Sequence, residues 1–485
     1  MSASITRRRV LKQIGAAGVF APAILATWRG RSLAALPPLP TVSPDDAQLL
    51  LPGQGNFEKD LSSANLRTIV RPQLRALCKT PNGVAAMVDW ARTNNVPFAL
   101  RSGGHCYENF CQSAGLVIDT RLMQDVPPIT GGTVTVGAGA TLGAIYNAIG
   151  AKGFAIPAGS CPTVGVSGHV LGGGFGLLGR PLGLACDSLE WIELVDPQGQ
   201  IIQADAQQHP DLYWACRGGG GGSFGVATRF RFKVHAVPQV VTFDMDWSLN
   251  AAGAAKIMKA WQAWAPQAPR TITSIFRIGK RQNGSINAHC AGQSVGSMAE
   301  VRNELKHLIN VEQPDQVPNI KSRTFLQAAK YFAGGPDPPT YFKCKSDYIL
   351  SPLSDDGIAT LIAGLRKLPA DAIVPICDAY GGAVADVAPD ATAFAHRAGT
   401  LYCIQYYSSW TSAADTPKRV KYVQDFYASM RPYVSGAAYV NYPDADLPDW
   451  SNAYWGSNLP RLRQVKAAFD PDNLFRHAQS VPLPA

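Results

Sequence analysis

The sequence predicts an α+β protein built from two main parts, and three observations lead to this fold class. At 485 residues the chain is longer than one ordinary domain. Its first half alternates amphipathic helix patterns with short apolar strand patterns. From about residue 240 to about residue 430, longer strand patterns are interleaved with amphipathic helices, which is typical of a mainly antiparallel sheet backed by helices.

The first half supplies short elements that run into glycines. Val84, Val88 and Ala91 share one face of a helix predicted over 82–95. Thr141 is a candidate N-cap for a second helix, which Gly150 or Gly153 would end. The other elements predicted here are strands at 96–101, 115–120 and 132–140 and a hairpin around the Pro-Gln-Gly turn within 187–205.

The second half supplies the long strands of the predicted antiparallel sheet. These strands are expected at 241–249, 285–296, 342–350, 372–382 and 401–410. A final helix is predicted from residue 458 and is stopped by the Asp-Pro-Asp-Asn run at 470–473.

The N-terminus is basic and then apolar, which resembles a twin-arginine export signal. Arg7, Arg8 and Arg9 precede the apolar run, and Leu33 to Ala35 form a possible cleavage region. The apolar run is shorter than a membrane span and contains a proline, so we expect no stable membrane association. Residues 1–35 hold six Lys or Arg and no acid, so the formal charge of +9 becomes 9 − 6 = +3 beyond them. That balance gives no case for nucleic-acid binding, and the signal predicts a periplasmic or secreted protein.

Ten cysteines are scattered along the chain without a C-x-x-C pair. Cysteines in an exported protein can form disulfides, but their pairing does not follow from this spacing. The absence of paired ligands predicts no metal site.

Three glycine-rich stretches, at 101–105, 158–183 and 216–225, are the strongest functional signal. Glycine allows the backbone to approach a ligand and to present N–H groups to phosphate. The chain has neither a P-loop nor the G-x-G-x-x-G fingerprint of dinucleotide-binding βαβ units. Three stretches at roughly 60-residue spacing nevertheless suggest one extended cofactor that touches all of them.

These residues resemble the berberine bridge enzyme-like FAD oxidases, within the vanillyl-alcohol oxidase (PCMH-type) superfamily. The resemblance rests on "RSGGHCYE" (101–108), on the segment 159–189, on "DLYWACRGGGGGSFGV" (211–226) and on the terminal segment from "YVNYPDAD" to "DPDNLF". It covers essentially everything after residue 65. Ser167, where a glycine is common, and "GLLGRPLG" (176–183), which is less basic than usual, depart from the family pattern.

The resemblance implies a domain plan. A PCMH-type FAD-binding domain is expected at 65–238, a substrate-binding domain at 239–430 and a segment at 431–485 that returns to the FAD domain, after the signal at 1–35. The expected cofactor-binding residues are Arg101, Ser102, Gly103, Gly104, His105, Gly159, Cys161, Val164, Gly165, Gly168, His169, Gly172, Gly225, Val226, Tyr454 and Asn458.

The resemblance also implies that FAD is attached twice, to the ring of His105 and to the sulfur of Cys161. Neutral imidazole and thiolate are nucleophiles suited to such bonds. Cys106 lies next to His105 and is the competing thiol, but side chains of adjacent residues usually diverge. His169 is expected to support the flavin loop.

The family places its catalytic tyrosine at the position of Tyr442. Tyrosine is a poor base at its ordinary pKa, so it needs either a lowered pKa or a proton acceptor, for which Asp378 is the candidate. Gln405 and Tyr107 are expected to orient the substrate, and core packing remains the alternative role for these side chains. The glutamine argues against the phenol chemistry of relatives that carry glutamate at the position of Gln405.

The predicted activity is oxidation of a small-molecule alcohol by hydride transfer to the flavin, with O2 as the acceptor and H2O2 as the product. A mono- or oligosaccharide is favoured because tryptophans and tyrosines of 247–250, 406–410 and 447–455 can stack on sugar rings. A polycyclic natural-product alcohol, a dehydrogenase with another acceptor and a flavin-carrying binding protein are the alternatives. The oligomeric state does not follow from the sequence.

Overall fold

The computed structural model describes residues 36–58, 61–335 and 338–484. The chain divides into an N-terminal unit, residues 1–38, and a second unit, residues 39–485. The fold reported below is that of the second unit. The predicted export signal and its cleavage region, residues 1–35, lie outside the described residues.

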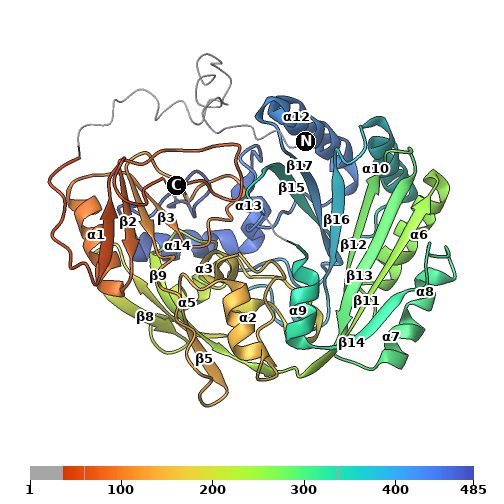
Figure 1. Ribbon diagram of the computed structural model, residues 1–485, viewed down its shortest axis with the longest axis horizontal. Helices are drawn as coiled ribbons and strands as arrows, with labels where there is room; N and C mark the ends of the chain where they lie inside the picture. Colours follow the sequence, from red (N-terminus) through yellow and green to blue (C-terminus); the bar gives the residue numbers. More distant parts are fainter. Residues whose placement is uncertain (1–35, 59–60, 336–337, 485) are drawn as a thin grey trace, which may run out of the picture. The chain divides into compact units, whose positions relative to one another are not determined.

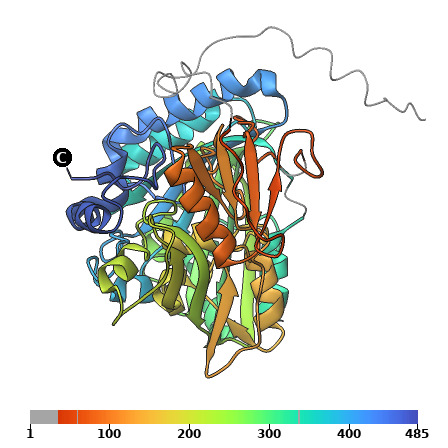
Figure 2. The same ribbon diagram turned by 90° about the vertical axis from the view of Figure 1, so that its left-hand side faces the viewer.

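Two four-stranded sheets form the first part of this unit (Figures 1 and 2). Helix α1 (Pro81–Thr93) packs against strands of both sheets. The first sheet has the order β1 (Ala47–Leu50), β2 (Leu74–Cys78), β4 (Leu116–Asp119) and β3 (Phe98–Arg101). The second has the order β5 (Thr133–Gly137), β9 (Val226–Lys233), β7 (Leu189–Val195) and β8 (Ile201–Asp205). The pair β6 (Phe154–Ala155) and β10 (His235–Ala236) lies outside both.

Short helices connect these sheets to the glycine-rich stretches. Thr141 caps helix α2 (Leu142–Gly150) by accepting a hydrogen bond from the Ala144 N–H, as its residue type predicts. The others are α3 (Val166–Leu171), α4 (Gly179–Leu182), the 3₁₀ turn η2 (Ala185–Ser188) and α5 (Pro210–Ala215).

A seven-stranded sheet forms the second part, and its hydrogen-bonded neighbours are all antiparallel within the described residues. Its order is β14 (Asn319–Thr324), β11 (Gln239–Leu249), β13 (Ile286–Ser294), β12 (Ile272–Lys280), β16 (Val374–Ala379), β17 (Tyr402–Trp410) and β15 (Tyr341–Ile349). Helices α6 (Ala251–Trp264), α10 (Asp355–Lys367) and α12 (Thr416–Met430) cover one face (Figure 1). The remaining elements here are α7 (Met298–Glu304), α8 (Lys306–Ile309), α9 (Phe325–Ala333), α11 (Ala383–Asp386), η3 (Ala413–Asp415) and η4 (Arg431–Tyr433).

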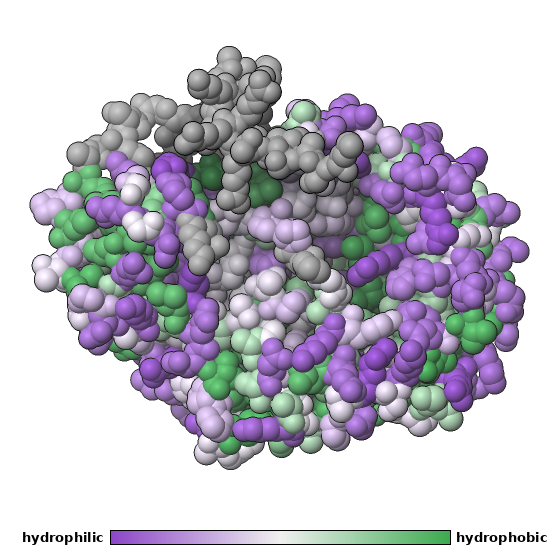
Figure 3. All heavy atoms as spheres, viewed as in Figure 1, coloured by the Kyte–Doolittle hydropathy of each residue, from purple (hydrophilic) through white to green (hydrophobic). Residues whose placement is uncertain are grey.

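The alternation of residues along β11 explains why this sheet needs its helices. Phe243, Met245 and Trp247 point to one face, and each is at most 2% exposed. They belong to a core shared with α6 and α10. The outer surface over α6, α8 and α10 carries mainly hydrophilic side chains (Figure 3).

The C-terminal segment returns to the first part of the unit. It contains α13 (Trp450–Trp455), η5 (Gly456–Asn458) and α14 (Leu459–Phe469), and α14 contacts α5 (Figure 1). The buried ammonium of Lys466 donates to the Asp470 carboxylate and to the carbonyls of Ser223 and Phe475. These bonds hold the chain end against the third glycine-rich stretch.

The predicted α+β class is confirmed, as are the hairpin of β7 and β8 and the antiparallel sheet backed by helices. Strands β1, β2, β6, β9, β10, β12 and β14 were not predicted. No helix among the described residues is long and apolar enough to cross a membrane.

Candidate active site

A cavity of about 560 Å³ lies where the three glycine-rich stretches, the inner face of the seven-stranded sheet and the C-terminal segment meet. Its size is in the range of cofactor and ligand clefts. The first part of the unit supplies residues 98–111, 159–177 and 219–227 of the lining. Strands β12, β16 and β17 supply the facing wall, and residues 439–443 and 475–479 close the side between them.

The first and second glycine-rich stretches contact each other directly through backbone. A Cβ placed on Gly103 would lie 2.2 Å from the Gly165 nitrogen, and one on Gly165 would lie 2.5 Å from the Gly103 nitrogen. No side chain fits at either position. These two glycines are therefore required by the contact between the stretches, rather than by the approach of a ligand alone.

Other glycines border open space in the cavity. A Cβ on Gly168 would meet nothing within 4 Å, and one on Gly221 would come no closer than 3.9 Å to any atom. Both residues line the cavity. A side chain here would project into the space that a cofactor needs, so the wall fits a large planar or phosphate-bearing ligand.

Two serines hold the stretches in place through one carbonyl. The hydroxyls of Ser102 and Ser167 both donate to the Ala138 carbonyl, at 2.8 Å and 2.6 Å. Ser167, which departs from the family's usual glycine, is therefore part of the scaffold. The Tyr146 hydroxyl donates to the Gly159 carbonyl in the second stretch.

The predicted cofactor residues line this cavity, with the exceptions of Gly172 and Asn458. Gly172 packs against the Asn441 amide, which a Cβ would meet at 2.1 Å. The Asn458 side chain donates instead to the carbonyls of Pro389 and Thr392 and so ties two loops together. The sequence pattern could not separate these structural roles from cofactor contacts.

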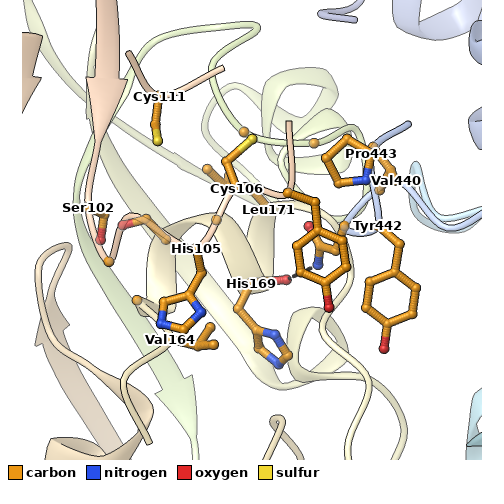
Figure 4. Close-up of a pocket in the computed structure, with 18 of the residues that line it drawn as sticks. Ser102, His105, Cys106, Cys111, Val164, His169, Leu171, Val440, Tyr442 and Pro443 are labelled. Atoms are coloured by element: carbon orange, nitrogen blue, oxygen red, sulfur yellow. Dashed lines mark hydrogen bonds between the residues drawn. The ribbon is translucent and has the colours of Figure 1, made fainter. Parts of the chain in front are cut away.

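The two predicted attachment residues, His105 and Cys161, both lie on the cavity wall. The Nε2 atom of His105 is 2.9 Å from the hydroxyl of Thr163, so a hydrogen bond links the two attachment segments. Cys161 is exposed to the cavity. In Figure 4 the Cys106 sulfur points away from the His105 ring.

Cys106 is poorly suited to react as a thiolate. Burial, with the neighbouring Cys111, raises the pKa of its thiol to about 12. The Phe110 N–H donates to its sulfur.

His169 has a supporting position in the second stretch. Burial lowers the pKa of its imidazole to about 4, so the ring is neutral, and its Nε2 accepts a hydrogen bond from the Gly159 N–H at 3.0 Å. Figure 4 shows the ring in the same pocket as His105 and Tyr442.

The facing wall is made of side chains that alternate along three neighbouring strands. Each strand contributes two residues to this wall, which are two positions apart and so point to the same side. They are Ile275 and Arg277 of β12, Ile376 and Asp378 of β16, and Gln405 and Tyr407 of β17. Ile275 lies opposite Asp378, and Ile376 lies opposite Gln405. The register thus gathers residues that are up to 132 positions apart in the sequence, Ile275 and Tyr407, into one patch.

Two tyrosines from different loops stack at this wall. The rings of Tyr107 and Tyr442 lie 5.4 Å apart at 9°. The Gln405 amide donates to the Tyr107 hydroxyl at 3.1 Å. Phe342 meets the Tyr107 ring edge-on at 4.9 Å and also contacts Tyr407, which extends the aromatic surface.

Tyr442 and Asp378 lie together in the cavity. Burial raises the pKa of Asp378 to about 7, although Arg277 and a hydrogen bond with Tyr442 both act to lower it. Burial and the Asp378 charge hold the pKa of Tyr442 well above its ordinary value. Of the two options for a tyrosine base, this geometry favours a proton acceptor, and Asp378 is placed to be that acceptor.

Several residues of the cavity were missed in the sequence. Arg277, Phe342, Tyr407 and His477 carry no local motif, and only the strand register or the chain end brings them to the cavity. His477 stacks on Phe110 at 4.9 Å and bonds the Gly221 carbonyl.

The tryptophans that favoured a sugar substrate are mostly core residues. Trp247, Trp410 and Trp455 are each at most 5% exposed and do not line the cavity. Only Tyr407 and Tyr454 from the three aromatic segments reach it. Tyr107, Phe342 and Tyr442 are among the aromatic residues that do face the cavity.

Comparison with protein families matches two parts of the chain. Residues 72–205 match the family model described as "FAD binding domain", and residues 438–482 match "Berberine and berberine like". The first range holds His105 and Cys161, and the second holds Tyr442.

Similar proteins span nearly the whole chain. The uncharacterised FAD-linked oxidoreductase YgaK of Bacillus subtilis is 34% identical over 88% of this chain and 95% of its own. Monolignol oxidoreductase AtBBE-like 13 of Arabidopsis thaliana is 32% identical over 82% of each chain. Among solved structures, Physcomitrella patens BBE-like 1 has a TM-score of 0.84 at 31% identity, covering 91% of this chain and 98% of that one. A chitooligosaccharide oxidase has a TM-score of 0.82 at 26% identity, covering 90% and 98%.

Proposed function

Because this chain belongs to the berberine bridge enzyme-like family of FAD-linked oxidoreductases, enzymes for alcohol-type substrates, we propose that it oxidises the hydroxyl of a mono- or oligosaccharide with O2 as acceptor. The observation that carries the proposal is the Tyr442–Asp378 pair, which shares one cavity with His105 and Cys161.

FAD is the cofactor, and its proposed attachment is to the His105 ring and the Cys161 sulfur. The fit rests on the open space beside Gly168 and Gly221 and on two nucleophilic side chains at the same wall. When bound, FAD would supply the acceptor for a hydride from the substrate carbon and the donor of two electrons to O2, with hydrogen peroxide as the product.

The protein's own task is to remove the hydroxyl proton as the carbonyl forms. Tyr442 accepts that proton at its hydroxyl oxygen while it donates its own proton to the Asp378 carboxylate. No free phenolate is needed, which agrees with the raised pKa of Tyr442. Asp378, with a pKa of about 7, is ionised often enough to act as the acceptor near neutral pH.

Gln405 and Tyr107 orient the substrate. The amide holds the Tyr107 hydroxyl, and the stacked tyrosine rings fix one side of the space in front of Asp378. The apolar faces of Tyr107 and Phe342 suit the C–H face of a pyranose ring. The chitooligosaccharide oxidase, a structural neighbour, acts on such a substrate according to its name.

The same aromatic surface also favours a second candidate, an aromatic or polycyclic alcohol. A relative is named as a monolignol oxidoreductase, and a structural neighbour, berberine bridge enzyme, is described in complex with (S)-reticuline. A dehydrogenase that uses an acceptor other than O2 is the corresponding alternative for reoxidation. We also propose that the basic, apolar N-terminal segment directs export of the folded protein to the periplasm or beyond.

An oxygen-consumption screen with mono- and oligosaccharides and with aromatic alcohols tests substrate and acceptor together. We expect oxygen uptake with at least one saccharide and equal formation of H2O2. Reduction of the flavin by a saccharide without oxygen uptake would point to the dehydrogenase. If no alcohol reduces the flavin, the proposed function is wrong.

A further inference from the structure

Six charged side chains form a buried cluster beside the cavity, at the edge strand β15 of the seven-stranded sheet. We call it the edge cluster, and its members are Arg67, Glu108, Lys343, Lys345, Asp444 and Asp446. Three are cations and three are carboxylates, so their formal charges balance. Balanced pairing is what allows such groups to be removed from water.

Lys343 is the centre of the edge cluster and is 1% exposed. Its ammonium lies 2.7 Å from the Glu108 carboxylate, 2.7 Å from Asp444 and 3.1 Å from Asp446. Among the described residues, it is the one side chain that bonds both Glu108 and Asp444. Each of these carboxylates also has a second cation, Arg67 for Glu108 and Lys345 for Asp444.

The two bridged carboxylates stand next to the two stacked tyrosines. Glu108 directly follows Tyr107, and Asp444 lies two residues after Tyr442. The two loops come from opposite ends of the chain. The centroids of their tyrosine rings lie 5.4 Å apart. Neither tyrosine hydroxyl is hydrogen-bonded to the other tyrosine.

Hydrogen bonds from side-chain amides to backbone carbonyls also hold these loops, but they do not link one loop to the other. The Asn65 amide donates to the carbonyls of Tyr107 and Phe342, and the Gln479 amide donates to the Asp444 carbonyl. These bonds join each loop to its own surroundings. Among the described residues, Lys343 of β15 is the charged side chain that pairs with a carboxylate from each loop.

We propose that Lys343 is a positioning residue, which holds the Tyr107 and Tyr442 loops in register so that the Tyr442 hydroxyl meets both the substrate and Asp378. This inference rests on the proposed function, because it assigns a cause to the geometry of that acid–base pair. A lysine that serves only the fold would stabilise the protein without affecting the rate per bound flavin.

Charge effects agree with a tight cluster. Burial alone would lower the pKa of Lys343, but Asp444, Glu108 and Asp446 outweigh it and raise the pKa. Burial alone would raise the pKa of Asp446, yet Lys343, Gln424 and Lys345 lower it to about 2. Both shifts favour the charged forms of Lys343 and Asp446.

The test compares Lys343→Met with Asp347→Asn, in the full-length flavoprotein. Asp347 is the matched control because it is a buried charge on the same strand, pairs with Arg431 and does not line the cavity. We expect Lys343→Met to keep its flavin, to lower kcat per flavin about tenfold or more and to leave KM within about twofold, since geometry at the reacting atoms changes more than binding. Asp347→Asn should at most lower the thermal midpoint, with kcat per flavin unchanged, and Lys343→Arg should recover part of the lost kcat.

Two further measurements keep the outcome decisive. If Lys343→Met does not fold, Glu108→Gln decides, because it weakens the link from Lys343 to the Tyr107 loop, together with the Arg67 pair, and leaves Lys343 paired with Asp444. Wild-type kcat per flavin in the folded variant, or an equal loss in Asp347→Asn, overturns the inference. Crystal structures should show the tyrosine rings moved from their stacked position in the variant. This readout needs no substrate, so it still decides the inference if no alcohol proves to reduce the wild-type flavin.

Discussion

The first part of the unit lines the cavity mainly with backbone, whereas the seven-stranded sheet lines it with side chains. Around Gly103 and Gly165 the chain segments touch through main-chain atoms, and at Gly168 and Gly221 the main chain borders open space. Across the cavity, Asp378, Gln405 and Tyr407 alternate along β16 and β17. The backbone wall is suited to holding a cofactor, and the side-chain wall is suited to moving a proton.

This difference suggests that the two walls can be changed separately. Substitutions in the backbone wall should alter flavin attachment. Substitutions in the side-chain wall should alter rate or pH dependence while the flavin stays bound.

The double change His105→Ala with Cys161→Ala should abolish covalent flavin. Each single variant should keep one bond, because the two residues attach to the cofactor independently. Acid precipitation followed by absorbance of the pellet measures the attached fraction. Flavin that remains on the double variant, or full release from either single variant, contradicts the two attachment sites.

Asp378→Asn should lower the rate of flavin reduction by about a hundredfold, at the low end of the range for a lost general base. The amide still fills the site but cannot accept the proton from Tyr442. In the wild type, Asp378 must be ionised, so the rate should fall as the pH drops below its pKa of about 7. Stopped-flow measurements of flavin reduction on both sides of pH 7 should show this fall in rate in the wild type and not in the variant. If Asp378→Asn keeps the same pH dependence, another group is responsible for it.

Gln405→Leu should reduce kcat/KM roughly fivefold, which corresponds to the loss of about one hydrogen bond, near 1 kcal/mol. The variant frees the Tyr107 hydroxyl but leaves Tyr442 and Asp378 in place. Gln203→Leu is a suitable control, since Gln203 bonds Asp205 in the hairpin and does not line the cavity. Equal effects of the two substitutions on kcat/KM would show that Gln405 does not help to orient the substrate.

Cys106→Ser should change neither flavin attachment nor rate by more than about twofold. Its thiol has a raised pKa, and its sulfur points away from the His105 ring (Figure 4). Peptide mass spectrometry of the variant should still find flavin on the peptides of His105 and Cys161. Loss of the second attachment would transfer that role from Cys161 to Cys106.

The backbone wall was largely predictable from sequence, and the side-chain wall was not. Glycine is required where main chains approach, so "RSGGH" and "VGVSGHVLGGG" mark that wall in consecutive residues. Tyr107, Asp378, Gln405 and Tyr442 were found only through the family resemblance. Arg277 and Tyr407 are exposed or half-buried residues that only the strand register places at the cavity.

The errors have a common physical origin. Trp247 and Trp410 lie on the helix-covered faces of β11 and β17, so both are buried in the core and point away from the cavity. The edge cluster was not foreseen, because Glu108, Lys343 and Asp444 lie more than 90 residues apart and charged residues are usually solvated.

The central claim is that Tyr442, with Asp378 of the side-chain wall, removes the substrate proton, while the backbone wall only holds the flavin. Anaerobic mixing of the wild type and of Tyr442→Phe with the same alcohol tests it directly. We predict that the wild-type flavin loses its visible absorbance, and that Tyr442→Phe does so about 100- to 10,000-fold more slowly with its flavin still attached. Equal rates of bleaching in the two proteins would contradict the account.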